Sequence, residues 1–430
     1  AITTGSNNTV IGYEAASKLT TGTDNVAVGR AALLDTTTQS GNVAVGVEAL
    51  ENNTADDNAA VGKHSLRANT TGSSNVGVGR DALLANTTAS NNTAVGKSSL
   101  GANTTGANNV AVGSLALDAN TTASNNTAVG ASSMGATTTG DQNVAMGAGS
   151  LANNTTGTIN VAIGYQALRD NTTANNNTAV GNQALVLNTT GTQNTAIGSF
   201  ALDAVTTAGQ NTAIGYGAGT AATGDGGTYV GYNAGAAVTT AGLNTVVGSY
   251  AFDAATTAGE SVAIGYAALT ATTTGASNTA VGYASLSANT TGTLNTAVGA
   301  LSLDANTTAN DGTAIGYAAL SNNTTGTQNT AVGKHALVAN TTGGSNVALG
   351  RHALAANTTA GNNTGLGYNS LLSNTTGTKN TAVGALSLDA TTTGSNNTSI
   401  GEQSLTTNTT GGNNTAVGTG ALALNTTASD

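Results

Sequence analysis

Three histidines are the first residues whose type and spacing could bind a metal ion: His64, His335 and His352. Each stands two positions after a glycine that recurs along the chain, and His335 and His352 occupy the same place in adjacent copies of a repeat. On adjacent turns of a coil their imidazoles would lie about 5 Å apart, close enough to share a metal ion. No acidic residue recurs beside them to orient a ring, so a solvated surface position is the simpler interpretation. We therefore predict no metal site.

Residues for catalysis are scarce, and those present are badly spaced for it. The chain has no cysteine, which excludes a thiolate nucleophile and a thiolate metal site. The segment from Gly96 to Ser98 lacks the earlier glycine of a phosphate-binding loop. Five aspartates share one position of a repeat but lie at least three repeats apart, too far for a calcium site or an acid/base pair: Asp118, Asp203, Asp253, Asp304 and Asp389. We predict no catalytic residues, no cofactor and no enzymatic activity.

Tyrosine occupies one position of the repeat in a pattern that suits surface contacts. Eight of the ten tyrosines directly follow a recurring glycine, and Lys or Arg takes the same position elsewhere, as at Arg30 and Lys334. Amphipathic rings in a row could contact glycans or partner proteins. The alternative is that they merely cover an edge of the coil, because aromatic residues suit stacked strands. We predict a surface-contact ladder of Tyr216, Tyr232, Tyr266, Tyr283 and Tyr317.

Asn-x-Thr triplets recur throughout the chain, as at Asn103 and Asn306. In a glycosylating host these residues would be candidate glycosylation sites, and one face would then carry sugar. The alternative is a ladder of turns, since Asn and Thr are also typical turn residues. An intact mass equal to the sequence mass would exclude the glycan.

The recurring glycine, here called the marker glycine, closes the motif NTAVG at 25 positions from Gly12 to Gly418. Of the 24 intervals, 22 have a length of 17, and the two that end at Gly62 and Gly231 have a length of 16. The consensus NTAVGxxALxANTTGxx alternates over a short strand before the marker glycine and then contains a turn. A unit of this length is too short for a helix pair. We predict an all-β, parallel β-solenoid (β-roll) of about 25 rungs, one per repeat, with residues 1–430 as a single continuous rod.

The composition fits stacked rungs. Charged residues make up only 7% of the 430 residues, as expected where each side chain meets its equivalent on the next rung and like charges would repel. Proline is absent, as expected where each interior backbone N–H is needed for a hydrogen bond between rungs. The net charge of −10 argues against nucleic-acid binding. No apolar run reaches the roughly 18 residues of a membrane span, so we expect no membrane insertion. A core of one Val or Ile before each marker glycine and one Leu after it is thin, which favours a homotrimer or filament.

The segments NVAIG, at Asn160 to Gly164, and SVAIG, at Ser261 to Gly265, resemble the head repeats of trimeric autotransporter adhesins of the YadA type. Similar motifs occur in phage tail fibres and other bacterial surface fibres. The resemblance implies a left-handed parallel β-roll shared by three chains. The family's usual head repeat is shorter than the repeat of this chain, in which the turn is extended by Asn-Thr-Thr.

Together these features predict an extracellular or cell-surface structural fibre or adhesin shaft. Its partners would be copies of itself and a glycan or protein of a host surface, bound through many weak contacts. The alternative is an ice-binding β-solenoid, since regular Thr ladders can match ordered water. Against that alternative, the Thr residues fall in turns with glycine rather than on a clearly flat strand.

Overall fold

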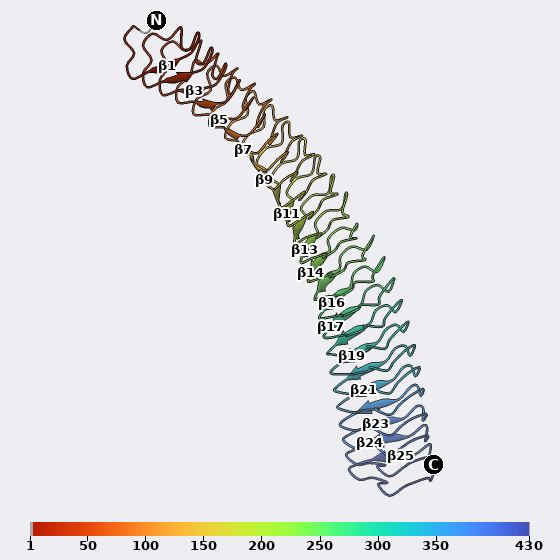
Figure 1. Ribbon diagram of the computed structural model, residues 1–430. Coiled ribbons are helices and arrows are strands. Elements are labelled where there is room, and N and C mark those ends of the chain that lie inside the picture. Colours follow the sequence, from red (N-terminus) through yellow and green to blue (C-terminus); the bar gives the residue numbers. More distant parts are fainter. Residues whose placement is uncertain (1–2, 430) are drawn as a thin grey trace. The chain divides into compact units, whose positions relative to one another are not determined.

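The computed structural model describes residues 3–429, and within them it contains 25 strands of three residues each and no helix (Figure 1). It divides into two units, unit 1 up to Asn211 and unit 2 from Thr212. The strands of unit 1 are β1 (Thr9–Ile11), β2 (Val26–Val28), β3 (Val43–Val45), β4 (Ala59–Val61), β5 (Val76–Val78), β6 (Thr93–Val95), β7 (Val110–Val112), β8 (Thr127–Val129), β9 (Val144–Met146), β10 (Val161–Ile163), β11 (Thr178–Val180) and β12 (Thr195–Ile197).

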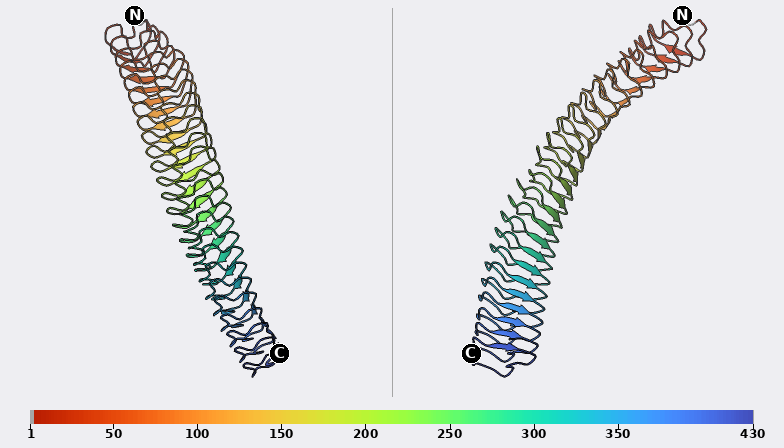
Figure 2. Two further views of the ribbon diagram at one scale, coloured as in Figure 1. Left: turned by 90° about the vertical axis from the view of Figure 1, so that its right-hand side faces the viewer. Right: turned by 180° about the vertical axis from the view of Figure 1, so that it is seen from behind.

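Unit 2 continues the same pattern with β13 (Thr212–Ile214), β14 (Thr228–Val230), β15 (Thr245–Val247), β16 (Val262–Ile264), β17 (Thr279–Val281), β18 (Thr296–Val298), β19 (Thr313–Ile315), β20 (Thr330–Val332), β21 (Val347–Leu349), β22 (Thr364–Leu366), β23 (Thr381–Val383), β24 (Thr398–Ile400) and β25 (Thr415–Val417). Within each unit the strands of successive rungs lie one above another (Figure 2). The predicted all-β parallel solenoid with a 17-residue repeat is confirmed, with about 24 turns.

Successive strands pair in parallel with one register. Thr178 lies opposite Thr195, and Thr279 opposite Thr296, an offset of one full repeat in each case. Across the two short repeats the offset is one less, as for Val43 opposite Ala59. The ladder continues outside the strands, where for example Thr20 N donates to Thr37 O at 2.8 Å. Each rung is therefore bonded to its neighbours around most of its circumference.

The strands face the opposite way from the prediction. In β2–β25 the middle residue is buried, whereas its two neighbours point outward. Ala162 is fully buried, but Ile163, just before the marker glycine, is 37% exposed. The expectation that this Val or Ile fills the core is wrong, because a coil this narrow has room only for a small side chain opposite its leucines.

Leucine fills the core at the fourth position after the marker glycine. Leu33 and Leu168 are typical, with no exposed surface and φ near 55°. Twenty of the 25 rungs have Leu at this position and none has Val, Ile or Thr. The left-handed backbone explains this choice, because β-branched side chains tolerate positive φ poorly.

Two buried columns of asparagine complete the interior. In one column, Asn109 N donates to Asn92 Oδ1 at 3.0 Å and Asn109 Nδ2 donates to Ala123 O at 2.9 Å. In the other, Asn103 Nδ2 donates to Asn86 Oδ1 at 2.9 Å. Most of these amides thus bond backbone groups of the turns and the amide of an adjacent rung, which offsets the cost of burying them.

The marker glycines have φ between 125° and 142°, a region that L-residues rarely adopt. A Cβ on Gly164 would lie 2.4 Å from the carbonyl oxygen of Gly181, the marker glycine of the next rung. The backbones of adjacent rungs therefore approach too closely here for any side chain. This close approach, together with the positive φ, accounts for the recurring glycine; at Gly418, on the last rung, only the positive φ applies.

The short repeat that ends at Gly231 holds an unusual residue. Tyr229 replaces the middle alanine of its strand and is fully buried, which raises the pKa of its phenol to about 12. Gly235 stands where other rungs have leucine, and a Cβ there would lie 2.3 Å from the Tyr229 ring. The aromatic ring thus fills the space that a leucine occupies elsewhere.

Ile159 yields a stability prediction, because it is β-branched, 52% exposed and has a φ of 58°. Asn is the commonest residue at the equivalent position of the other rungs. Relieving the strain with Ile159→Asn should stabilise the fold by about 1 kcal/mol and raise the midpoint of thermal unfolding. The reverse change Asn125→Ile, at the same position with a φ of 61°, should lower it. Equal midpoints for both variants and the parent chain would contradict the strain argument.

Candidate functional site

The predicted contact tyrosines are exposed in unit 2, with 50% of Tyr216, 45% of Tyr232 and 57% of Tyr283 accessible. Tyr216 and Tyr232 stack, their ring centroids 5.5 Å apart and their planes within 12°. Tyr266 and Tyr283 stack likewise, at 5.7 Å and 10°. The common register of the rungs sets this spacing, because successive rings leave the backbone at equivalent points.

Tyr250 belongs to the same row, although the sequence argument missed it. It stands two positions after its marker glycine rather than one. Its ring nevertheless lies edge-on between Tyr232 and Tyr266, with centroid distances of 5.2 and 6.1 Å. Counting both positions after the glycine would have found it. These five residues, Tyr216, Tyr232, Tyr250, Tyr266 and Tyr283, are called the tyrosine ladder below.

Tyr317 lies apart from the tyrosine ladder, beyond a rung that carries Ala300 and Leu301 at the two positions. Its ring contacts His335, with centroids 5.5 Å apart. His335 in turn lies 5.2 Å from His352, as their equivalent places in adjacent repeats predict. Among residues 3–429 no three His, Asp or Glu side chains gather closely enough to hold a metal ion.

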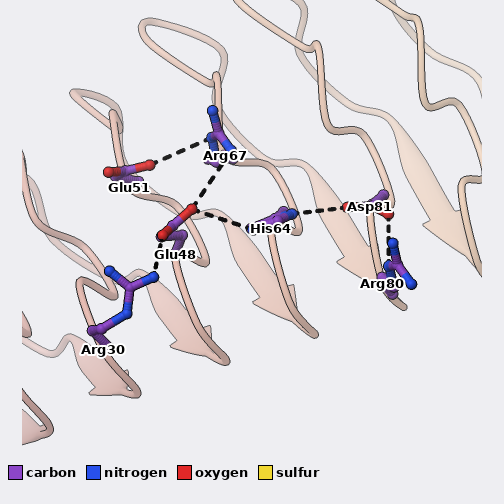
Figure 3. A network of polar contacts seen from close by, with 7 residues as sticks. All are labelled: Arg30, Glu48, Glu51, His64, Arg67, Arg80 and Asp81. Atoms are coloured by element: carbon purple, nitrogen blue, oxygen red, sulfur yellow. Dashed lines mark hydrogen bonds and ion pairs between the residues drawn. The ribbon is translucent and has the colours of Figure 1, made fainter.

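His64 has a different environment in unit 1. The expectation that no carboxylate orients a histidine is wrong here: Nδ1 lies 3.0 Å from Asp81 Oδ1 and Nε2 lies 3.3 Å from Glu48 Oε2. All three residues stand two positions after their marker glycines, so comparing adjacent rungs would have revealed the alternation. Figure 3 shows the wider network of Arg30, Glu48, Glu51, His64, Arg67, Arg80 and Asp81.

This network shows how the coil accommodates charge. Desolvation acts to raise the pKa of Glu48, but Arg30, His64 and Arg67 together hold it below its ordinary value. Adjacent rungs thus alternate in sign, which removes the repulsion that like charges would have in one column. The arginines reach into solvent whereas the acids and His64 are half-buried, so solvent screens each pair in part and each contributes modestly to stability by itself.

The five aspartates predicted to be isolated do not meet in the structure. Desolvation is the main cause that raises the pKa of Asp118, Asp203, Asp253 and Asp304. Asp389 accepts a hydrogen bond from Thr406 Oγ1 at 2.5 Å. Each carboxylate therefore interacts within its own stretch of the coil, and their arrangement forms no acid/base pair.

The outward residues of the strands form what we call the outer strand face. Its first column holds Thr or Val, except for Ala59 of β4, and its second holds Val, Ile, Leu or Met, as with Thr313 and Ile315 of β19. Many residues of the second column are about two-fifths exposed, for example Ile315 at 40%, and others, such as Val298, are half-buried. In unit 2 the first column is Thr in every strand except β16 and β21. Each unit thus exposes a regular strip of β-branched side chains.

Asn103 and Asn306, the candidate glycosylation sites, are both fully buried. Asn306 Nδ2 donates to Asn289 Oδ1 at 3.0 Å and to Ala309 O at 3.2 Å. The nitrogen to which a glycan would be attached is therefore occupied in the folded chain. This geometry favours the turn ladder over the glycan.

No known protein family and no curated protein matches the chain in sequence comparison. The two units present three distinctive surfaces: the outer strand face, the tyrosine ladder and the positions that follow the marker glycines. Within residues 3–429 there is no helix long and apolar enough to cross a membrane.

The turn ladder can be separated from glycosylation with two variants that both destroy the same Asn-x-Thr triplet. Asn103→Ala removes the hydrogen bonds to Asn86 and Gly106 and should destabilise the chain by about 1–3 kcal/mol in urea unfolding. Thr105→Ala, at an exposed residue, should change stability by less than about 0.5 kcal/mol. Intact mass after expression in a glycosylating host provides the second readout. Equal stability of the two variants would contradict the structural role of Asn103 in the turn ladder. So would a parent chain heavier than its sequence mass whose excess both variants abolish.

Proposed function

We propose that the chain is part of an extracellular structural fibre or adhesin shaft that assembles as a homotrimer and presents a repeated surface for attachment. The observation that carries the proposal is the outer strand face. A half-exposed column of Val, Ile and Leu on nearly every rung is a large apolar strip, the kind of surface that marks an interaction site. The resemblance of the repeat to YadA-type heads supports three copies.

The magnitude of the burial is adequate for assembly. Covering the exposed part of one such side chain is worth about 1 kcal/mol, as a fraction of its full transfer energy. A dozen rungs in register would sum to more than the cost of association, which is of order 10 kcal/mol. Because the strip repeats, a second copy in the same register would meet equivalent residues on every rung. Assembly would also leave the positions after the marker glycines available for multivalent attachment.

Lysine in the outer strand face should weaken assembly. We expect the parent chain to sediment at three times the 41.1 kDa of one chain. The double variant Ile163→Lys, Ile197→Lys places charge in the apolar column and should shift the protein towards monomer. The matched control Thr173→Lys, Thr190→Lys adds the same charge at exposed turn residues and should remain trimeric. A folded parent chain that sediments as a stable monomer would contradict the homotrimer.

The threonine column of unit 2 supports ice binding as a second candidate function. Thr stands outward on a parallel strand as well as in the turns, for example Thr296 and Thr313 on adjacent rungs. Such a column repeats hydroxyl and methyl groups about every 4.8 Å, a regular array that ordered water could match. This arrangement removes the objection that the Thr residues lie only in turns. The same face cannot be buried between copies and also contact ice.

Thermal hysteresis distinguishes the two functions. If unit 2 binds ice, a solution of the chain should show hysteresis that Thr296→Lys, Thr313→Lys abolishes and the turn variant Thr291→Lys preserves. Absence of hysteresis at millimolar concentration would exclude ice binding and leave the fibre as the remaining candidate.

A further inference from the structure

A stretch of unit 2 is basic in an otherwise acidic chain. The protein has 20 acidic and 10 basic residues, yet residues 312–388 contain no Asp or Glu. The same stretch contains Lys334, Arg351 and Lys379, together with His335 and His352. The nearest acidic residues along the chain are Asp311 and Asp389. A local positive field is therefore built into four or five rungs of this unit.

Four of these side chains form a compact cluster. Lys334 and Arg351 directly follow marker glycines on adjacent rungs, and both are exposed. His335 and His352 follow them, with ring centroids 5.2 Å apart. The backbone holds the set in register, because His352 N donates to Lys334 O at 3.1 Å. These four residues are called the basic cluster below.

The basic cluster has no internal counter-charge. In the described part of the chain neither Lys334 nor Arg351 has a carboxylate within ion-pair distance. In unit 1 the same two positions hold Glu48, His64 and Asp81, which alternate with arginines and neutralise them. Two cations on adjacent rungs without an acid beside them repel one another, and a bound anion would relieve that repulsion.

Two tyrosines flank the basic cluster and add an apolar contact surface. Lys334 Nζ lies 5.5 Å from the ring centroid of Tyr317, and Arg351 Cζ lies 6.0 Å from that of Tyr368. Each ring is 49% exposed. Rings of this kind can pack against the C–H face of a sugar, while guanidinium and ammonium groups bind carboxylate or sulfate. The tyrosine ladder continues the aromatic row elsewhere in the same unit.

We propose that the basic cluster, with Tyr317 and Tyr368, binds the carboxylate or sulfate groups of an acidic polysaccharide. The inference rests on the proposed attachment function and gives it a ligand class. A repeating polymer suits a surface that itself repeats at a fixed spacing. Nucleic acid is disfavoured because a polyphosphate needs many clustered cations, whereas this site has two permanent ones.

Protonation should tune the site. Partial burial, together with the positive charges of Arg351, His335 and Lys334, holds the pKa of His352 below its ordinary value. The other ionisable groups that contact the cluster are the phenols of Tyr317, which lies against His335, and of Tyr368, which lies against Arg351. An anion favours the charged imidazole, so binding takes up protons. Affinity should therefore rise as the pH falls from about 7.5 to 5.5, across the ordinary histidine range.

Calorimetric titration of the full chain tests the proposal with three probes of equal length: an alginate, a heparin-derived and a neutral dextran oligosaccharide. We expect the parent chain to bind at least one acidic probe and not dextran. Lys334→Gln, Arg351→Gln should weaken that binding at least about tenfold. The control Lys97→Gln, Lys379→Gln removes the same charge outside the cluster and should retain it. His335→Gln, His352→Gln should flatten the pH dependence.

Three results would overturn the inference: no binding of either acidic probe, equal loss in the cluster and control variants, or tighter binding of single-stranded DNA than of both acidic probes. Sedimentation of the same variants separates this test from the proposed fibre. Loss of binding with an unchanged trimer confirms the cluster as the site. Absence of any binding in an intact trimer removes the ligand but leaves the fibre.

Discussion

In-register parallel hydrogen bonding between successive rungs is the constraint on which the rest of the structure depends. Because each residue pairs with its equivalent in the next repeat, every position of the repeat becomes a column in which a side chain meets its counterpart about 4.8 Å away. Amides and hydroxyls extend such columns as hydrogen-bonded ladders, whereas repeated like charges would repel. The 7% charge content and the absence of proline follow from this constraint.

The same constraint lets each unit develop its own surface by substitution at a few positions. Around His64 in unit 1, acidic and basic side chains alternate on adjacent rungs, so that they pair with one another within the column. In unit 2 the equivalent positions hold the tyrosine ladder and then the basic cluster, whose cations have no carboxylate partner in the described chain. The scaffold is therefore uniform, and the surfaces of the two units differ most clearly at the two residues after the marker glycine.

The repeat predicts the strands, their parallel stacking and the rung length, because so short a period leaves few other ways to bury the chain. It could not predict which way a three-residue strand faces. Val26, Ala27 and Val28 alternate equally well in either orientation, and only the width of the coil places Ala27 inside. The sequence also could not predict the backbone conformation of the core leucines. Leu33 resembles an ordinary core residue in the sequence, but its left-handed φ is what excludes valine from this position. Tyr250 was not predicted to belong to the tyrosine ladder because the rings of that ladder come from two positions of the repeat, the first and the second after the marker glycine.

Distances between spin labels one repeat apart test the register most directly, and the absence of native cysteine allows clean labelling. Thr173 and Thr190 are both exposed and occupy equivalent positions of adjacent repeats. In the double variant Thr173→Cys, Thr190→Cys the two labels are attached to backbones about 5 Å apart. They should therefore give strong dipolar broadening in the EPR spectrum, measured on a sample diluted with unlabelled chain. The spectrum of each singly labelled chain should lack it. A doubly labelled spectrum equal to the sum of the two single spectra would contradict in-register stacking.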